Sequence, residues 1–179
     1  HPGIGNKDFT LLNGVLDYCE NLSTMNNDRP GVIHRLDKDT SGVIVFAKNN
    51  ESHYFISEQF ANREIKKEYK SIIWGNLNER KEIRGFIRRD PKNRLKFRLF
   101  NNKGKNSISI VKPGKLYSIP ISFVTIFPLT GRTHQIRVHC SSIGHPIIKD
   151  DLYNGSDSII EGFHEKDRKR ISNVLEKIK

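Results

Sequence analysis

The segment GVIHRLDKDTSGVIVF, residues 31–46, places one carboxylate, Asp37, between two cations, Arg35 and Lys38. Nearby cations favour the ionised form of a carboxylate. The turn-forming residues 38–42 predict a sharp bend, which would hold Asp37 at the rim of a sheet, where ligands commonly bind. An ionised, oriented carboxylate is a competent nucleophile toward an anomeric carbon. A structural turn or an ion pair explains the same residues, and this segment alone leaves both interpretations open.

A second segment, LTGRTHQIRVH at residues 129–139, predicts the start of a helix over 132–143. Free N–H groups at a helix N-terminus can bind an anion, and Arg132 at that end suits a phosphate. Two pairs of polar side chains follow at helical spacings of three and four, His134 with Arg137 and Gln135 with His139. Arg137 can pair with Asp37 and hold it charged, although a cation on the helix surface is an equally good interpretation.

A third segment combines an aromatic ring with cations. Tyr69 stands between Lys67 and Lys70 in the stretch 64–74, whose alternation predicts a strand. A ring among cations is typical of surfaces that stack a base beside a phosphate path, but a tyrosine of the core fits the same pattern. We interpret the cations around the alternating stretch 94–100 as a phosphate track: Arg84, Arg88, Arg89, Lys92, Arg94, Lys96 and Arg98.

Spacing argues against a metal site. His134 and His139 lie five residues apart, which is not the i, i+4 spacing of two zinc ligands on one helix face. Cys19 and Cys140 fit no zinc motif. We therefore predict no metal, structural hydrogen bonds for both histidines, and two small core thiols in a protein of a reducing compartment.

Composition restricts the class of partner. The chain has 179 residues, of which 35% are hydrophobic and 28% charged, as expected for a folded protein with one core. Lysine and arginine outnumber aspartate and glutamate by 31 to 20, which gives a formal charge of +11. No stretch approaches the roughly 18 apolar residues of a membrane-spanning helix. The excess of positive charge therefore favours nucleic acid as the partner over a membrane.

The elements that must position these side chains follow from apolar periodicity. Helices are predicted over 11–19, 51–62, 132–143 and 171–178, and strands over 43–47, 64–74, 94–100, 107–111 and 116–127. The uninterrupted apolar run 43–47 predicts a buried strand, and Pro120 favours an edge or a bulge in the last strand. Antiparallel-looking strands with interspersed helices predict an α+β fold. Without a repeat or linker, we predict a single domain over 1–179.

The three segments together resemble the RluA-type pseudouridine synthases. The resemblance is carried by HRLDKDTSG, KKEY and GRTHQIRVH, in that order, with SSIGHPIIKDDLY behind them, and it runs from His1 to about Tyr153. It implies that Asp37 is the catalytic aspartate. It also implies that Tyr69 packs against the target base and assists proton removal from C5, that Arg137 pairs with the aspartate, and that Arg35 fills the place of the flipped uridine.

The resemblance further implies a mixed, mainly antiparallel sheet with flanking helices, a central catalytic cleft and no cofactor. The expected reaction is isomerisation of uridine to pseudouridine in ribosomal or transfer RNA. In this reaction the aspartate either attacks C1′ or removes a ribose proton. RNA contacts are predicted for Arg35, Lys67, Arg132, His134 and Gln135. We expect a monomer with no membrane partner.

Three departures from the family pattern stand out. The strand that usually precedes the HPG at residues 1–3 is missing, and Lys149 replaces the usual glycine before Asp150. Residues 154–179 diverge from the family and read as a loop followed by a basic helix.

Two other functions fit some of the same residues. One is a non-catalytic RNA-binding protein on the same scaffold, against which the presence of Asp37, Tyr69 and Arg137 argues. The other is a phosphoryl hydrolase in which Asp37 and Asp39 hold a metal, although no further carboxylate cluster accompanies them.

Overall fold

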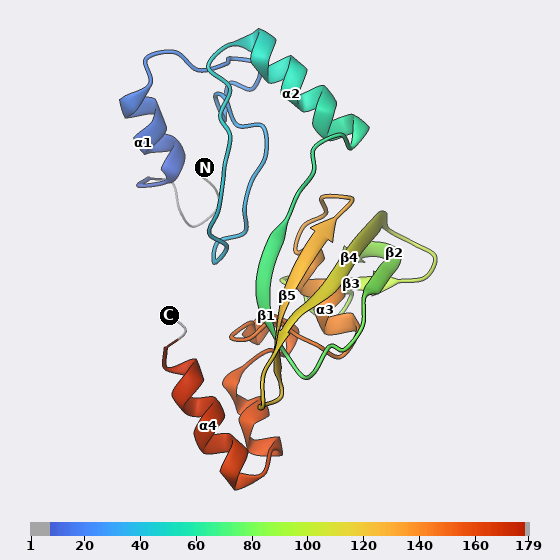
Figure 1. Cartoon of the computed structure of the whole chain (residues 1–179). Helices are drawn as coiled ribbons and strands as arrows, with labels where there is room; N and C mark the ends of the chain where they lie inside the picture. Colours follow the sequence, from blue (N-terminus) through green and yellow to red (C-terminus); the bar gives the residue numbers. More distant parts are fainter. Residues whose placement is uncertain (1–7, 178–179) are drawn as a thin grey trace. The chain divides into compact units, whose positions relative to one another are not determined.

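The computed structural model describes residues 8–177, so the HPG at 1–3 and the last apolar position of the C-terminal stripe, Ile178, lie outside it. The chain forms two compact units, the first ending at Ile65 and the second beginning at Lys66 (Figure 1). In the described part, no helix has the length and apolar character needed to cross a membrane.

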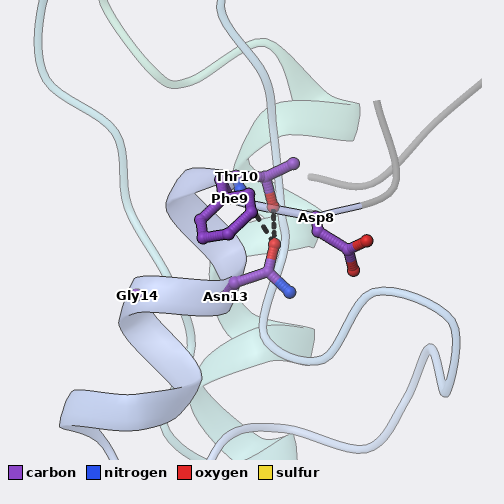
Figure 2. Close-up of a pocket in the computed structure, with 5 residues that line it drawn as sticks. All are labelled: Asp8, Phe9, Thr10, Asn13 and Gly14. Atoms are coloured by element: carbon purple, nitrogen blue, oxygen red, sulfur yellow. Dashed lines mark hydrogen bonds between the residues drawn. The ribbon is translucent and has the colours of Figure 1, made fainter. Parts of the chain in front are cut away.

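The first unit contains two helices, α1 (Leu11–Tyr18) and α2 (Asn50–Asn62), which confirm the two N-terminal helix predictions. Helix α1 begins after Thr10, whose backbone N–H and hydroxyl both donate to Asn13 Oδ1, at 2.9 and 2.6 Å. Figure 2 shows these bonds beside a shallow pocket at the start of the helix. Its lining holds one ionisable side chain, the exposed Asp8, so it offers no evident chemistry.

The predicted buried strand over 43–47 is wrong. Its only pairing among the described residues is a single bridge between Val32 and Phe46, and Val43 is 85% exposed. Backbone bonds gather instead at its end, where Ala47 donates to Gly31 O at 2.8 Å and is itself buried. An apolar run forms a strand only where a neighbouring strand can complete the ladder, and only one residue of this run is buried.

The second unit is built on a five-stranded sheet. Its strands are β1 (Tyr69–Trp74), β2 (Lys81–Arg89), β3 (Phe97–Phe100), β4 (Lys105–Leu116) and β5 (Ile121–Pro128), in the spatial order β1-β5-β4-β2-β3. All of these neighbours pair antiparallel. With the helices α3 (Gln135–Ser142) and α4 (Glu165–Leu175), the sheet confirms the predicted α+β class.

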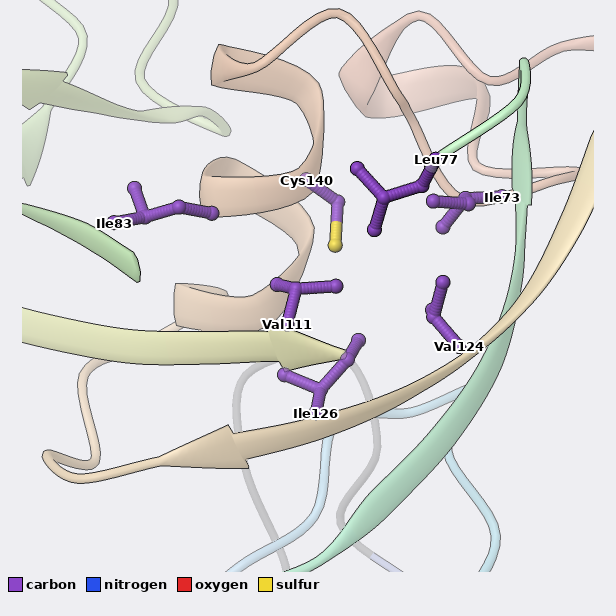
Figure 3. Close-up of a cluster of buried hydrophobic side chains, with 7 residues drawn as sticks. All are labelled: Ile73, Leu77, Ile83, Val111, Val124, Ile126 and Cys140. Carbon is purple, nitrogen blue, oxygen red and sulfur yellow. The ribbon is translucent and has the colours of Figure 1, made fainter. Parts of the chain in front are cut away.

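Three apolar clusters hold this unit together, of which the smallest joins Ile87, Val138 and Tyr153. On one face of the sheet, Cys140 of α3 points into a cluster of buried strand residues that includes Val111, Val124 and Ile126 (Figure 3). On the other face, α4 and the short helix η2 (Asp157–Gly162) cover Trp74 and its neighbours. The tail that follows Tyr153 is therefore part of the packed structure of this unit. The predicted C-terminal helix is present, but α4 spans Glu165–Leu175 and not 171–178, and the predicted loop contains η2.

Several boundaries differ from the predictions. Strand β2 was not predicted, because cations interrupt its apolar residues. The stretch 116–127 is not one strand: β4 ends and β5 begins around residues 117–120, with a register shift between Pro113 and Leu116. Helix α3 begins at Gln135 and not at Arg132, since His134 has a left-handed backbone with φ of 54°.

Candidate active site

Asp37 lies in the first unit, in a turn that the local backbone defines. Its carbonyl oxygen accepts from Thr40 N at 3.0 Å, which closes the turn that the sequence predicted. On the other side of the loop, Val45 N donates to His34 Nε2 at 3.0 Å, and the His34 ring stacks on Phe60 with centroids 5.3 Å apart. These contacts hold the segment that carries Asp37, although it contains no helix or strand. Arg35 is exposed.

Tyr69 and Arg137 belong to the second unit. Tyr69 is the first residue of β1 and packs, half-buried, against the apolar cluster under α3. Both alternatives for this residue therefore keep some support, since it contacts the core and still has an exposed part. The predicted pairing of Asp37 with Arg137 joins the two units, and it stays a prediction.

The loop before α3 is fixed by one buried amide, Gln135, which is 3% exposed. Its Oε1 accepts from Thr130 Oγ1 at 2.7 Å and from Arg132 N at 3.0 Å. Its Nε2 donates to Ile108 O at 3.0 Å and to Ser109 Oγ at 2.9 Å. Because both ends of this amide are engaged inside the protein, direct contact of Gln135 with RNA would require the network to open.

The two predicted cations of this loop are placed by backbone oxygens. Lys67 Nζ donates to Thr130 O at 3.3 Å, and Arg132 Nε donates to Asn106 O at 2.9 Å. Lys67 thus binds the turn between β5 and α3, whereas Arg132, which belongs to this turn, binds β4. Their position leaves a concentration of positive charge at the start of α3, where an anion is favoured.

Arg137 forms a buried ion pair that the sequence did not predict. Its Nε and Nη2 donate to the two carboxylate oxygens of Asp150 at 2.8 and 2.7 Å, and the Asp150 side chain is 7% exposed. The guanidinium Cζ also lies 4.8 Å from the centre of the Tyr153 ring. The Arg137 guanidinium is therefore fixed along one edge by Asp150 and on one face by Tyr153. This excludes the interpretation of Arg137 as only a cation on the helix surface.

His134, at the start of α3, contacts Tyr153 and so lies beside the Arg137–Asp150 pair. Its Nδ1 is 2.7 Å from Tyr153 Oη, which also accepts from Phe97 N at 2.9 Å. The His134 ring contacts the rings of Phe97 and Tyr153 edge-on, at 5.5 and 5.6 Å. His134 thus makes the predicted structural hydrogen bond.

Two ionisable side chains buried behind the site, His139 and Cys140, carry no charge. His139 Nε2 lies 3.0 Å from Ser107 Oγ, and burial lowers the pKa of His139 to about 4. Burial, together with the nearby Asp150 charge, raises the pKa of Cys140 to about 12. Both groups are therefore neutral at physiological pH. Cys140 is buried as predicted, whereas Cys19 is only partly buried. Within residues 8–177, no cluster of three or more metal-ligating side chains occurs.

Three site residues were missed from the sequence: Phe97, Asp150 and Tyr153. One signal was available, since an acid and an aromatic follow a buried apolar run in IIKDDLY, and a buried acid needs a cationic partner. Nothing in the local pattern, however, indicated that this partner would be Arg137.

Comparison with known proteins defines the family. The model of the RNA pseudouridylate synthase family matches residues 16–142, a range that contains all three predicted catalytic residues. The chain therefore belongs to the RNA pseudouridylate synthase family.

Individual relatives agree with this assignment. The ribosomal large subunit pseudouridine synthase D of Borreliella burgdorferi is 38% identical over 165 residues, covering 90% of this chain and 50% of the relative. An uncharacterized RNA pseudouridine synthase of Aquifex aeolicus is 39% identical, covering 89% and 51%. The solved structure of human RNA pseudouridylate synthase domain containing 1 is 33% identical, with a TM-score of 0.62 over 68% of this chain and 54% of that chain. The chain thus spans about half the length of the curated relatives it matches.

Proposed function

We propose that this chain carries the catalytic part of an RNA pseudouridine synthase that isomerises uridines without a cofactor. The observation that carries the proposal is the family match over residues 16–142, with Asp37, Tyr69 and Arg137 all inside it. The names of the relatives favour ribosomal RNA of the large subunit as the substrate, ahead of transfer RNA. The proposal treats residues 1–179 as one catalytic domain with a central cleft, active as a monomer.

The reaction is an isomerisation, so atoms and electrons balance within the nucleotide. The target uridine leaves the RNA stack, which costs a few kcal/mol. Asp37 then assists cleavage of the C1′–N1 bond, by attack at C1′ or by removal of a ribose proton. The uracil turns and a C1′–C5 bond forms, as the Asp37–C1′ bond breaks or as Asp37 returns the ribose proton. The C5 proton is then lost to water, with Tyr69 positioned to assist, and N1 takes up a proton.

The remaining predicted residues act on the RNA. Arg35 takes the place of the extruded base, and Lys67 and Arg132 bind phosphate at the turn before α3, where their positive charge is concentrated. His134 contacts RNA from the start of α3. Gln135 supports this turn from inside, as its buried hydrogen bonds require.

The test is tritium release from RNA labelled at uridine C5. The wild-type protein should release tritium to water from large-subunit ribosomal RNA transcripts, and pseudouridine should appear in equal amount. Wild-type protein that binds the transcripts but releases no tritium from any of them would favour the non-catalytic RNA-binding function. EDTA should leave the release unchanged, whereas the metal-dependent hydrolase would lose its activity.

A further inference from the structure

The ion pair turns one edge of the Arg137 guanidinium toward Asp150 and the outer edge away from it. A guanidinium has five N–H donors, and two of them, on Nε and Nη2, are committed to Asp150. Of the other three, two lie on the outer edge formed by Nη1 and Nη2, and the third is the remaining N–H of Nη1. Such a bidentate pair fixes the plane and the direction of the guanidinium, which a single contact would leave free to rotate.

The turn that carries Asp150 is itself tightly held. Asp150 O accepts from Tyr153 N at 3.0 Å and from Gly155 N at 2.8 Å, and Gly155 O accepts from Trp74 Nε1 at 2.9 Å. A Cβ on Gly155 would lie 1.8 Å from the backbone oxygen of Ile147, so only glycine fits there. The carboxylate is therefore presented by a rigid backbone.

The residue before Asp150 connects this turn to the divergent tail. Lys149 has a left-handed backbone with φ of 62°, and its Nζ donates to Leu175 O, in the last turn of α4, at 3.0 Å. A left-handed backbone is unfavourable for lysine, and the bond to the helix C-terminus offsets part of that cost. The usual glycine is thus replaced by a residue that ties the turn to α4.

We propose that Asp150 is a positioning residue for the isomerisation. It fixes Arg137 so that the outer edge of the guanidinium meets the anionic oxygens of the reaction, those of Asp37 or of the reacting nucleotide. Tyr153 keeps the guanidinium in its plane from the side of the ring, and its own hydroxyl is fixed by Phe97 N and His134. This inference rests on the proposed function, because it assigns Asp150 a role through Arg137.

The variant Asp150→Asn tests this proposal. It keeps the shape of the side chain but removes its negative charge and one hydrogen-bond acceptor. Misplacement of a catalytic group by about 1 Å can cost on the order of 100-fold in rate. We therefore expect kcat for tritium release to fall roughly 10- to 100-fold, while KM for RNA stays within about twofold. The matched control is Asp151→Asn, which removes the same charge from the next residue, whose side chain is exposed. Its kcat should stay within about threefold of the wild type.

Three results would overturn the proposal. One is a folded Asp150→Asn protein with the wild-type kcat, and another is a variant in which only KM rises. The third comes from the wild-type protein and does not depend on any variant folding. The Arg137 Nε–H, assigned by its loss in Arg137→Lys, should exchange slowly with water in NMR spectra, and rapid exchange would contradict a fixed guanidinium. If the wild type releases no tritium at all, the proposed function fails, while this exchange measurement still tests the fixed geometry.

Discussion

The two segments that identify the family are equally distinctive in sequence but are held in different ways. HRLDKDTSG contains no helix or strand. Asp37 lies in a turn that a backbone bond from Thr40 closes, and His34 accepts from Val45 N and stacks on Phe60. GRTHQIRVH is anchored by the buried Gln135 network and by the Arg137–Asp150 pair. We therefore expect changes at Asp37 to affect turnover more than stability, whereas changes in the second segment should affect both. Changes in the two segments should separate these quantities.

The largest effect is expected for Arg137→Ala. Removal of one partner of a buried ion pair costs about 3–5 kcal/mol, because Asp150 is left charged and unpaired. Turnover should be lost as well, since the guanidinium is the proposed partner of Asp37. Urea unfolding and tritium release measure the two losses. The double variant Arg137→Ala/Asp150→Asn should recover much of the lost free energy of unfolding but none of the turnover. Full activity of the single or the double variant would exclude Arg137 from the site.

Acid should destabilise the second unit through His139. Below about pH 6.5 the unfolded chain binds a proton at this residue, whereas the folded protein does so only near its pKa of about 4. The free energy of unfolding is therefore unaffected by His139 above pH 6.5. It decreases as the pH falls toward 4, by roughly 2–3 kcal/mol at about pH 4.5. Urea unfolding at several pH values measures this loss. His139→Gln should show a smaller dependence in that window, and an unchanged dependence would assign the effect to other groups.

Gln135→Ala should cost about 1–3 kcal/mol, because several buried partners lose their hydrogen bonds. The turn that carries Arg132 should loosen, so KM for RNA is expected to rise. The matched change in the other segment is Thr40→Ala, which retains the backbone bond to Asp37 and should leave the free energy of unfolding within about 0.5 kcal/mol. Equal destabilisation by the two variants would remove the contrast between the segments.

The two cysteines give the smallest and simplest comparison. Cys140 is fully buried with a pKa of about 12, so it should resist alkylation in the native protein. Cys19, in the first unit, is partly exposed and should react first. Mass spectrometry after brief treatment with iodoacetamide measures this difference. Rapid modification of Cys140 would contradict the packing under α3.

Helix α4 buries Ile171 and Leu175, as its apolar stripe predicts, whereas α2 buries His53 and leaves Tyr54 and Phe55 exposed. Sequence patterns thus predicted the helices α1, α2 and α4 and the α+β class. They failed where long-range pairing decides the structure. The run 43–47 lacks a ladder partner, and β2 is a strand because β3 and β4 flank it despite its cations.

The candidate site shows the same limit. The motifs predicted Asp37, Tyr69 and Arg137 as candidate site residues. They did not predict where α3 starts, because His134 takes a left-handed conformation next to Gln135, whose side chain is hydrogen-bonded to β4. Asp150 was not readable either, since its partner lies thirteen residues away, on a different element. Motifs thus indicate the candidate reacting groups, while the groups that position them depend on tertiary contacts.

The central claim is that the carboxylate of Asp37 performs the chemistry, and one matched pair of variants tests it most directly. Asp37→Asn and Asp39→Asn remove the same charge from the same turn, two residues apart. With RNA saturating in both cases, Asp37→Asn should release no tritium from uridine C5, and Asp39→Asn should release it at nearly the wild-type rate. Tritium release by Asp37→Asn at the rate of Asp39→Asn would contradict the account.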